Sequence, residues 1–182
     1  MYLLNCENVL CIGAYPGDVE YSIFGTIIKK YKTNFTIIVL EETSQSNKKE
    51  LQGIWDGIQN LSGQFGDLKN INQKPDLIIT CSNNDLDSKR RETYQIGLNK
   101  FLSEGVGFCT YKTVTGYESN FNFYCDITGQ YNKKSFILQD IKPMIDEKYL
   151  EKTYMNTFNS NNIYSNLFDK KVESLNIIGY VE

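Results

Sequence analysis

Three short apolar runs alternate with segments of helical periodicity, and this alternation constrains the fold more than any other feature of the chain. The runs are residues 8–14 (NVLCIGA), 35–40 (FTIIVL) and 76–80 (DLIIT), and each is typical of a buried strand. Residues 19–31 between the first two place isoleucines at helical spacing and carry lysines near the end, which suit the dipole of a helix carboxyl end. Such a βαβ unit implies parallel strands and a right-handed crossover. The sequence therefore predicts an α/β fold with a Rossmann-like, doubly wound, mostly parallel sheet.

The rest of the chain continues the pattern less clearly. Residues 46–62 and 90–103 carry apolar stripes at helical spacing, and two glycines weaken the first stripe. We expect further strands at residues 108–114, 121–127 and 173–181, helices at 133–141 and 148–158, and a polar loop at 159–166. A chain of 182 residues can bury one sizeable core, so we predict a single domain over residues 1–182.

The absence of histidine excludes several functions at once. The chain has no histidine, and so lacks the commonest general base and the commonest zinc ligand. Catalysis by Ser-His-Asp or Cys-His arrangements is excluded. The net charge of -3 argues against a nucleic-acid binder and against an anionic membrane surface. We expect neither nucleic acid nor membrane as a partner.

The cysteines and the absence of targeting signals indicate the compartment. The five cysteines are odd in number and lie mostly in apolar runs, as expected of reduced cysteine in a reducing compartment. No apolar stretch could span a bilayer, and no basic region opens a secretory signal. We expect a cytoplasmic protein. The abundance of Asn, Lys, Ile and Tyr, typical of AT-rich genomes, also fits a virion made in the cytoplasm.

Two loops follow predicted strands at the edge of the sheet where ligands bind in folds of this kind. They span residues 15–20, after the first strand, and 81–90, after the third. Ligands of doubly wound sheets lie outside the carboxyl ends of the strands, so we predict a site between these loops.

The two loops resemble those of a known family. The first reads VLCIGAYPGDVE and the second, with its strand, reads PDLIITCSNNDLDSKR. They resemble the PIG-L/LmbE family of zinc-dependent N-acetylglucosamine deacetylases, which has Ala-His-Pro-Asp-Asp-x-Glu in the first loop and Thr-His-Ser-Pro-x-Asp-x-His-x-Asp-His in the second. Residues 120–128 and the segment around Glu173 extend the resemblance over nearly the whole chain. The stretch between residues 62 and 75 is abbreviated, as if a strand and a helix had been trimmed.

The resemblance implies a site whose zinc chemistry is lost. The family's three zinc ligands fall on Tyr15, Asp18 and Arg90, of which only Asp18 keeps the family's ligand, and arginine cannot bind a metal near neutral pH. The catalytic base falls on Gly17, which has no side chain, and the histidine that assists the oxyanion falls on Asp87, whose charge would repel it. Because the mechanism needs a Lewis acid, an activated water and a base, the resemblance implies an inactive domain with no catalytic residue, no zinc and no cofactor.

Several candidate residues have two readings. Arg90 could pair with Asp18 and so replace the charge of the metal, or it could bind an anion, and we favour the pair. Tyr15 could close the old pocket or stack on a sugar, and we favour closure. Asp18 could also serve only the dipole of the helix that it begins. The remaining alternative is an all-oxygen calcium or magnesium site formed by Asp18, Glu20, Asp85 and Asp87. Aspartates in loops more often form turns, and we favour that role.

Three roles follow from these readings. An inactive domain could bind a glycan or nucleotide-sugar in the old pocket, or it could be a structural or assembly subunit with a protein partner or in a homo-oligomer, for instance in a virus particle. In the third role the chain is an active deacetylase of N-acetylated sugars that uses a rebuilt carboxylate metal site. An open cleft lined by Tyr15, Asp87 and Arg90 would favour binding. A filled cleft with a large apolar patch elsewhere would favour assembly.

Overall fold

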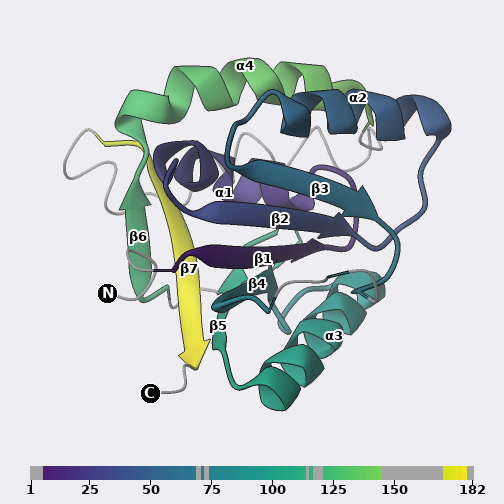
Figure 1. The fold of residues 1–182 in the computed structure, drawn as a ribbon, viewed down its shortest axis with the longest axis vertical. Coiled ribbons are helices and arrows are strands. Elements are labelled where there is room, and N and C mark those ends of the chain that lie inside the picture. The colour runs from purple at the N-terminus through teal and green to yellow at the C-terminus, as the bar shows by residue number, and fades with distance from the viewer. Residues whose placement is uncertain are drawn as a thin grey trace.

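A seven-stranded mixed sheet with helices on both faces forms the molecule (Figure 1). The computed structural model describes residues 6–68, 71, 74–113, 115–116, 121–144 and 170–179. The strands are β1 (Asn8–Gly13), β2 (Asn34–Val39), β3 (Leu61–Phe65), β4 (Leu77–Cys81), β5 (Gly107–Tyr111), β6 (Phe123–Asp126) and β7 (Val172–Gly179). The helices are α1 (Asp18–Lys29), α2 (Gln45–Asp56), α3 (Ser88–Glu104) and α4 (Tyr131–Ile141), with short 3-10 helices η3 (Thr128–Gln130) and η4 (Lys142–Met144).

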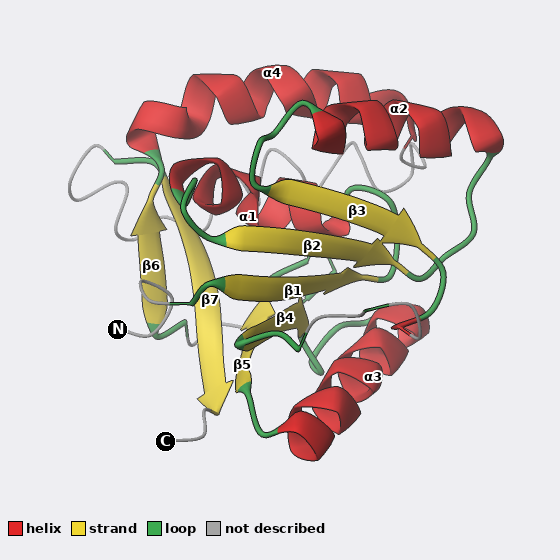
Figure 2. Cartoon of the chain, viewed as in Figure 1, coloured by secondary structure: helices red, strands yellow, loops and turns green. Residues whose placement is uncertain are grey.

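The strand order confirms the predicted fold class. The order is β3-β2-β1-β4-β5-β7-β6; β1 to β5 are parallel to one another, while β7 pairs antiparallel with both β5 and β6. Helices α1, α2 and α4 lie on one face of the sheet and α3 lies on the other (Figures 1 and 2). The strand order reverses between β1 and β4: β2 and β3 follow β1 on one side, and β5 follows β4 on the other. The loops after β1 and β4 therefore diverge, at the place where such folds bind ligands.

The central strands are apolar throughout because both faces of the sheet are covered. Cys11 and Ile79 face the core on the α1 side, and Leu10 and Ile12 face the smaller core under α3. All four side chains are at most 1% exposed. Strands buried on both faces need near-continuous apolar residues, and this need explains the runs seen in the sequence.

A buried ion pair ties the last strand to the first helix. Glu173 of β7 accepts hydrogen bonds from the Gly25 and Thr26 amides at 2.8 and 2.6 Å and from the Thr26 hydroxyl at 2.6 Å. Lys134 of α4 lies 2.5 Å from the same carboxylate and also donates to the Tyr21 carbonyl. With the ionised side chains 3% and 4% exposed, the clamp is fully desolvated, and its hydrogen bonds offset the cost of burial.

The prediction for the region after the second strand was wrong. The helix predicted over residues 46–62 is α2, which ends at Asp56, and a strand, β3, begins at Leu61. Strand β3 is an edge strand in which Leu61 alone is fully buried, so it lacks the apolar run that reveals the central strands. The other predicted elements in the described ranges are present with shifted ends, while the predicted helix 148–158 and loop 159–166 lie outside the described residues.

Two further expectations can be compared with the described residues. The five cysteines are all free thiols, and four of them are buried, as predicted for reduced cysteine. Within the described ranges, no helix is both long enough and apolar enough to cross a membrane.

We expect Gly63→Ala to destabilise the fold by about 1–3 kcal/mol or more, because a Cβ there would lie 1.8 Å from Cε3 of Trp55. The indole of Trp55 is fully buried and cannot move aside freely. Gly53→Ala on exposed helix α2 is the matched control, because its Cβ meets nothing within 4 Å; it should stabilise by about 0.5–1 kcal/mol. Urea unfolding measures both, and equal midpoints would contradict the packing described here.

Candidate functional site

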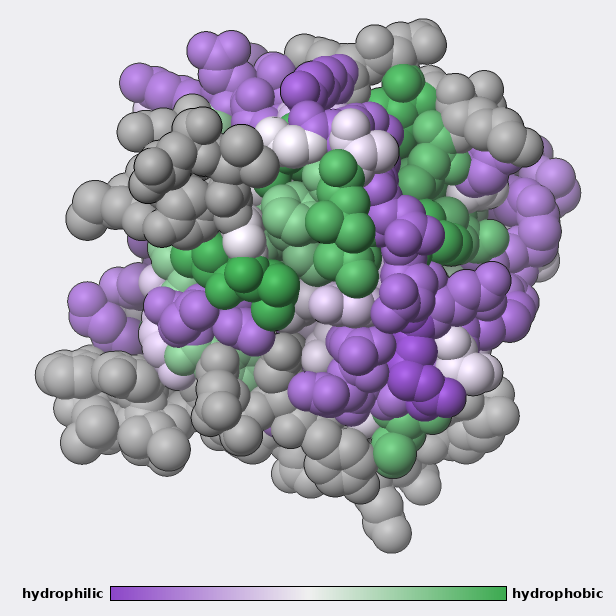
Figure 3. Space-filling model, turned by 90° about the horizontal axis from the view of Figure 1, so that it is seen from below, coloured by the Kyte–Doolittle hydropathy of each residue, from purple (hydrophilic) through white to green (hydrophobic). Residues whose placement is uncertain are grey.

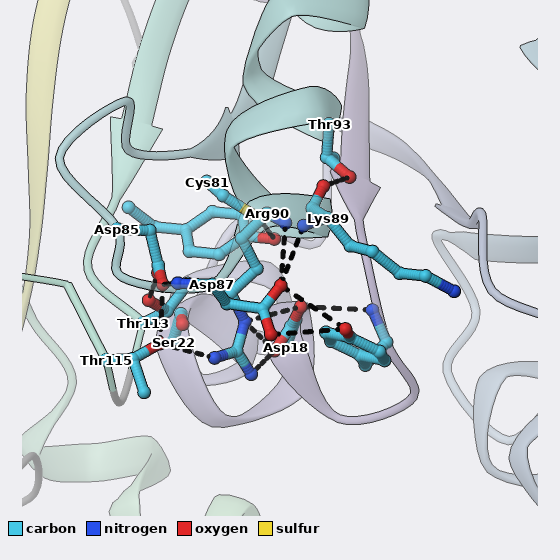
Figure 4. Close-up of polar contacts among 12 residues, drawn as sticks. Asp18, Ser22, Cys81, Asp85, Asp87, Lys89, Arg90, Thr93, Thr113 and Thr115 are labelled. Atoms are coloured by element: carbon cyan, nitrogen blue, oxygen red, sulfur yellow. Dashed lines mark hydrogen bonds and ion pairs between the residues drawn. The ribbon is translucent and has the colours of Figure 1, made fainter.

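The loops after β1 and β4 meet in a buried ion pair between Asp18 and Arg90 (Figure 4). Arg90 Nη2 donates to Asp18 Oδ1 at 2.7 Å, and Arg90 Nε lies 3.2 and 3.3 Å from the two carboxylate oxygens. The residues are 4% and 5% exposed. The predicted pairing of these residues is confirmed, and its geometry is the fork-like approach that guanidinium groups make to carboxylates.

Asp18 is positioned by a tight turn at the start of α1. Gly17 has φ 91°, in the left-handed region that glycine adopts at little cost, and it stands at the N-cap of the helix. The Asp18 amide donates to the Tyr15 carbonyl at 3.2 Å, and Asp18 Oδ2 accepts from the Tyr15 amide at 3.0 Å. The turn folds the Asp18 carboxylate back on its own loop and towards α3.

Arg90 is positioned by the first turn of α3, which Asp87 caps. Asp87 Oδ1 accepts from the amides of Lys89 and Arg90 at 2.9 and 3.1 Å, an N-cap arrangement that begins the helix at Ser88. The position of Asp87, three residues before Arg90, thus sets the direction in which the guanidinium leaves the helix. Asp87 also accepts a hydrogen bond from the Tyr15 hydroxyl at 3.2 Å.

Asp85 joins this loop to the segment that follows β5. It is 3% exposed, its Oδ2 accepts from the Thr113 hydroxyl, and its Oδ1 accepts from the Thr115 hydroxyl at 2.5 Å and from the Asp87 amide at 2.9 Å. Thr115 in turn accepts from Arg90 Nη1 at 2.7 Å. The sequence did not indicate Thr113 or Thr115; their position just beyond strand β5 was the only available signal.

Tyr15 lies over the ion pair. Its ring centroid is 5.2 Å from Cζ of Arg90, within range of a cation–π interaction, and its hydroxyl reaches Asp87. The guanidinium therefore contacts a carboxylate, a threonine hydroxyl and an aromatic face. These contacts link the two loops, with the Tyr15 side chain half-buried over the ion pair.

Glu20, in the first turn of α1, faces away from the ion pair. Its Oε1 accepts from the Trp55 indole at 2.7 Å, facing α2, and its Oε2 is buried without a partner. The alternative of an all-oxygen metal site loses one of its four carboxylates in this way. In the ranges described, the structure contains no group of three or more Asp, Glu, Cys or His side chains that could hold a metal ion.

Burial determines the electrostatics of the site. Desolvation opposes the charged form of Arg90, but the Asp18 carboxylate more than offsets it and the pKa of Arg90 is raised, so it stays cationic. Burial raises the pKa of Asp18, while Arg90 acts in the opposite direction. Burial also raises the pKa of Glu20 to about 7, against the lowering effect of the Trp55 hydrogen bond. Cys81, next to the site, is fully buried and its pKa is raised by desolvation, which makes it a poor nucleophile.

We expect the stability of the fold to decrease as pH rises from about 4.5 to above 7, in part because of Glu20. Its folded-state pKa exceeds its unfolded value of 4.5, so the folded protein holds the proton more tightly and loses this advantage as the proton dissociates. The free energy of unfolding of Glu20→Gln, relative to that of the wild type, should therefore increase by up to about 3 kcal/mol between pH 4.5 and pH 8. Chemical unfolding at several pH values measures this gain. A profile of Glu20→Gln that runs parallel to that of the wild type would disprove the assignment.

A cavity of about 320 Å³ lies beside the ion pair, at the carboxyl ends of β1, β2 and β3 and against α3. It is lined by Ala14, Leu40, Glu41, Gly66, Asp67, Lys89, Glu92, Thr93 and Ile96. Its lining includes Ala14, which precedes Tyr15, and Lys89, which precedes Arg90, so the cavity adjoins both loops of the ion pair. Sequence reasoning missed this cavity because it placed the site only between the loops that follow the first and third predicted strands.

No protein-family model matches the chain, and no curated protein matches it in sequence. Solved structures do match in fold. The chain is similar to the N,N'-diacetylchitobiose deacetylase from Pyrococcus horikoshii, with 13% identity and a TM-score of 0.72 over 96% of this chain and 84% of that one. It is also similar to the 4-carboxy-2-hydroxymuconate hydratase from Pseudomonas putida, with 12% identity and a TM-score of 0.71 over 95% and 96% of the two chains.

A deacetylase of the teicoplanin biosynthesis pathway matches more distantly, with 9% identity and a TM-score of 0.56 over 94% of this chain and 99% of that one. At these identities the likeness concerns the fold alone. The chain has the fold of these deacetylases, as the resemblance of its two loops predicted. The hydratase has a similar fold but is named for a different reaction, so the fold does not decide the function.

Proposed function

We propose that this chain keeps the fold of a zinc-dependent deacetylase without the zinc chemistry, and that it serves as a binding module. The observation that carries the proposal is the ion pair of Arg90 with Asp18 at 2.7 Å. The fixed cation of Arg90 engages the carboxylate that, by resemblance to the family, would ligate zinc. Arginine does not lose its proton at physiological pH, so this positive charge is permanent.

The residues present do not fit a catalytic zinc ion. Such an ion needs three protein ligands with nitrogen, sulfur or carboxylate donors, and the loops offer Asp18 together with a tyrosine and an arginine. The general-base position is Gly17, which has no side chain, and its backbone is committed to the turn. The other carboxylates of the loops are engaged, with Asp85 holding two threonines and Asp87 capping α3.

Assembly is the second candidate, and the surface of the α3 side favours it. Figure 3 shows apolar side chains gathered near the centre of this face with hydrophilic ones around them. Leu102 of α3 and Ile178 of β7 are 68% and 46% exposed, and Phe101 packs beside Gly179 where the two elements meet. Clusters of this kind occur at protein–protein interfaces. Assembly into a homo-oligomer, or into a larger particle such as a virion, would cover these side chains.

The test combines metal analysis with an activity assay on one sample. We expect plasma mass spectrometry to find no stoichiometric metal in the purified protein, and N-acetylglucosamine substrates with added zinc to release no acetate. Stoichiometric metal together with acetate release that disappears in Asp18→Ala would overturn the proposal and establish a rebuilt carboxylate site.

Light scattering after gel filtration separates binding from assembly. A monomer whose elution is unaltered by Leu102→Asp would favour the binding module. A defined oligomer that Leu102→Asp dissociates would favour assembly, because a charge on an apolar interface is costly to bury.

A further inference from the structure

Helix α2 is joined to the rest of the molecule by few buried side chains. Of its 12 residues, only Leu51 and Trp55 are buried, and the helix packs on β3, an edge strand of the sheet (Figure 1). Strand β1 differs, because it is covered on both faces and its residues 9–13 are all buried. Local opening of a fold costs least where few apolar side chains are buried.

The Trp55 side chain provides most of the attachment of α2. Its Nε1 donates to Glu20 Oε1 at 2.7 Å, and its ring lies against Gly63, where a Cβ would come within 1.8 Å of Trp55 Cε3. In the part of the chain that the structure describes, the other side-chain hydrogen bonds of α2 join residues of one segment: Asn47 with Thr43 and Ser44, Lys48 with Glu42, and Gln52 with Asp56.

Two further contacts connect this segment to other elements at the surface. The Lys48 ammonium lies 5.6 Å from the centre of the Phe65 ring, and Glu41, in the loop before α2, pairs with Lys89 of α3. The side chains of Lys89 and Glu41 are 49% and 35% exposed, and exposed ion pairs contribute little to stability.

The sequence of α2 also makes it a weak helix on its own. Gly53 lies in its interior, where glycine lowers helix stability, and Gly57 stands at its C-cap. Its first turn has no acidic residue and its last turn no basic one, so charged side chains do not complement the helix dipole at either end. An isolated helix of 12 residues is marginal in water, so α2 depends on its contact with β3.

We propose that α2 is a strap that opens as a unit, held shut by the Trp55 indole, while the central sheet and the Asp18–Arg90 pair stay folded. The open form exposes the indole and the face of β3 that α2 covers. A partner that binds these surfaces supplies only the free energy of the local opening, and not that of global unfolding. The inference goes beyond the proposed function and does not depend on it.

Native-state hydrogen exchange of the intact chain, followed by mass spectrometry at fixed pH, tests the inference. After correction for intrinsic rates, we expect the α2 amides to exchange at least about tenfold faster than those of β1 and β4. Their exchange should also respond less to urea, because a local opening exposes less surface than global unfolding. Equal protection with equal urea dependence would overturn the inference, because α2 would then open only when the whole chain unfolds.

Two variants distinguish local from global opening. Ile78 is fully buried in the core under α3, on the face of the sheet opposite α2, so Ile78→Val should accelerate exchange in β1 and β4 about two- to tenfold and leave α2 unchanged. Trp55→Phe keeps a ring but removes the donor to Glu20, and should accelerate exchange of α2 about tenfold. Equal acceleration of α2, β1 and β4 by Ile78→Val, or no effect of Trp55→Phe on α2, would overturn the inference.

Discussion

Replacing Arg90 with alanine is expected to destabilise the fold by about 3–5 kcal/mol, because it leaves the Asp18 carboxylate buried without its cation. The loss would also remove the hydrogen bond to Thr115 and the contact with the Tyr15 ring. Urea unfolding followed by circular dichroism measures the difference.

A second variant separates the ion pair from ordinary packing. If the pair stabilises mainly by avoiding a lone charge, then changing Asp18 and Arg90 together to Leu and Met should recover most of the stability lost in Arg90→Ala. A double variant that is as unstable as the single one would mean that the geometry of the site, rather than its charge balance, carries the energy. Arg91→Ala is the neighbouring control; it removes hydrogen bonds to the Asp85 and Leu86 carbonyls and should cost less, because Arg91 is exposed.

Introducing two histidines is expected to convert the ion pair into a zinc site. In the variant Tyr15→His/Arg90→His, both new imidazoles would start close to Asp18, since the Tyr15 amide and the Arg90 guanidinium already donate to its carboxylate. Three ligands of this type suffice to hold zinc with an open fourth position. We expect one zinc per chain and a thermal midpoint that rises with zinc, corresponding to about 4 kcal/mol when zinc exceeds its dissociation constant a thousandfold.

The control for this variant is Tyr15→Phe/Arg90→Gln, which alters the same positions without offering a metal ligand. It should show neither bound zinc nor a zinc-dependent midpoint. If the histidine variant folds and takes up no zinc, then the correspondence of the two loops with those of the deacetylases is wrong, whatever the fold.

The sequence was informative where burial leaves no choice. Strands β1, β2 and β4 are covered on both faces, so their residues had to be apolar and their positions could be predicted. The pairing of Asp18 with Arg90 could be predicted for a similar reason. Their loops meet at one edge of the sheet, and a buried charge is costly unless an opposite charge lies beside it.

The features that escaped prediction depend on contacts between distant segments. Strand β3 is an edge strand, and its Gly63 is explained only by the Trp55 ring that packs on it. Glu20 stands two residues from Asp18, yet on helix α1 that separation turns it towards α2 and away from the site. The cavity is formed by the ends of three strands and one helix, and no local pattern marks such a meeting of segments.

The clamp at Glu173 bears on how the chain acquires its structure during synthesis. Its hydrogen bonds to Gly25 and Thr26 join residues 148 and 147 positions apart. A ribosome adding about 5–20 residues per second delivers that glutamate many seconds after the helix that it holds. Throughout that interval the Gly25 and Thr26 amides lack this acceptor, so helix α1 reaches its final contacts only after β7 has been synthesised.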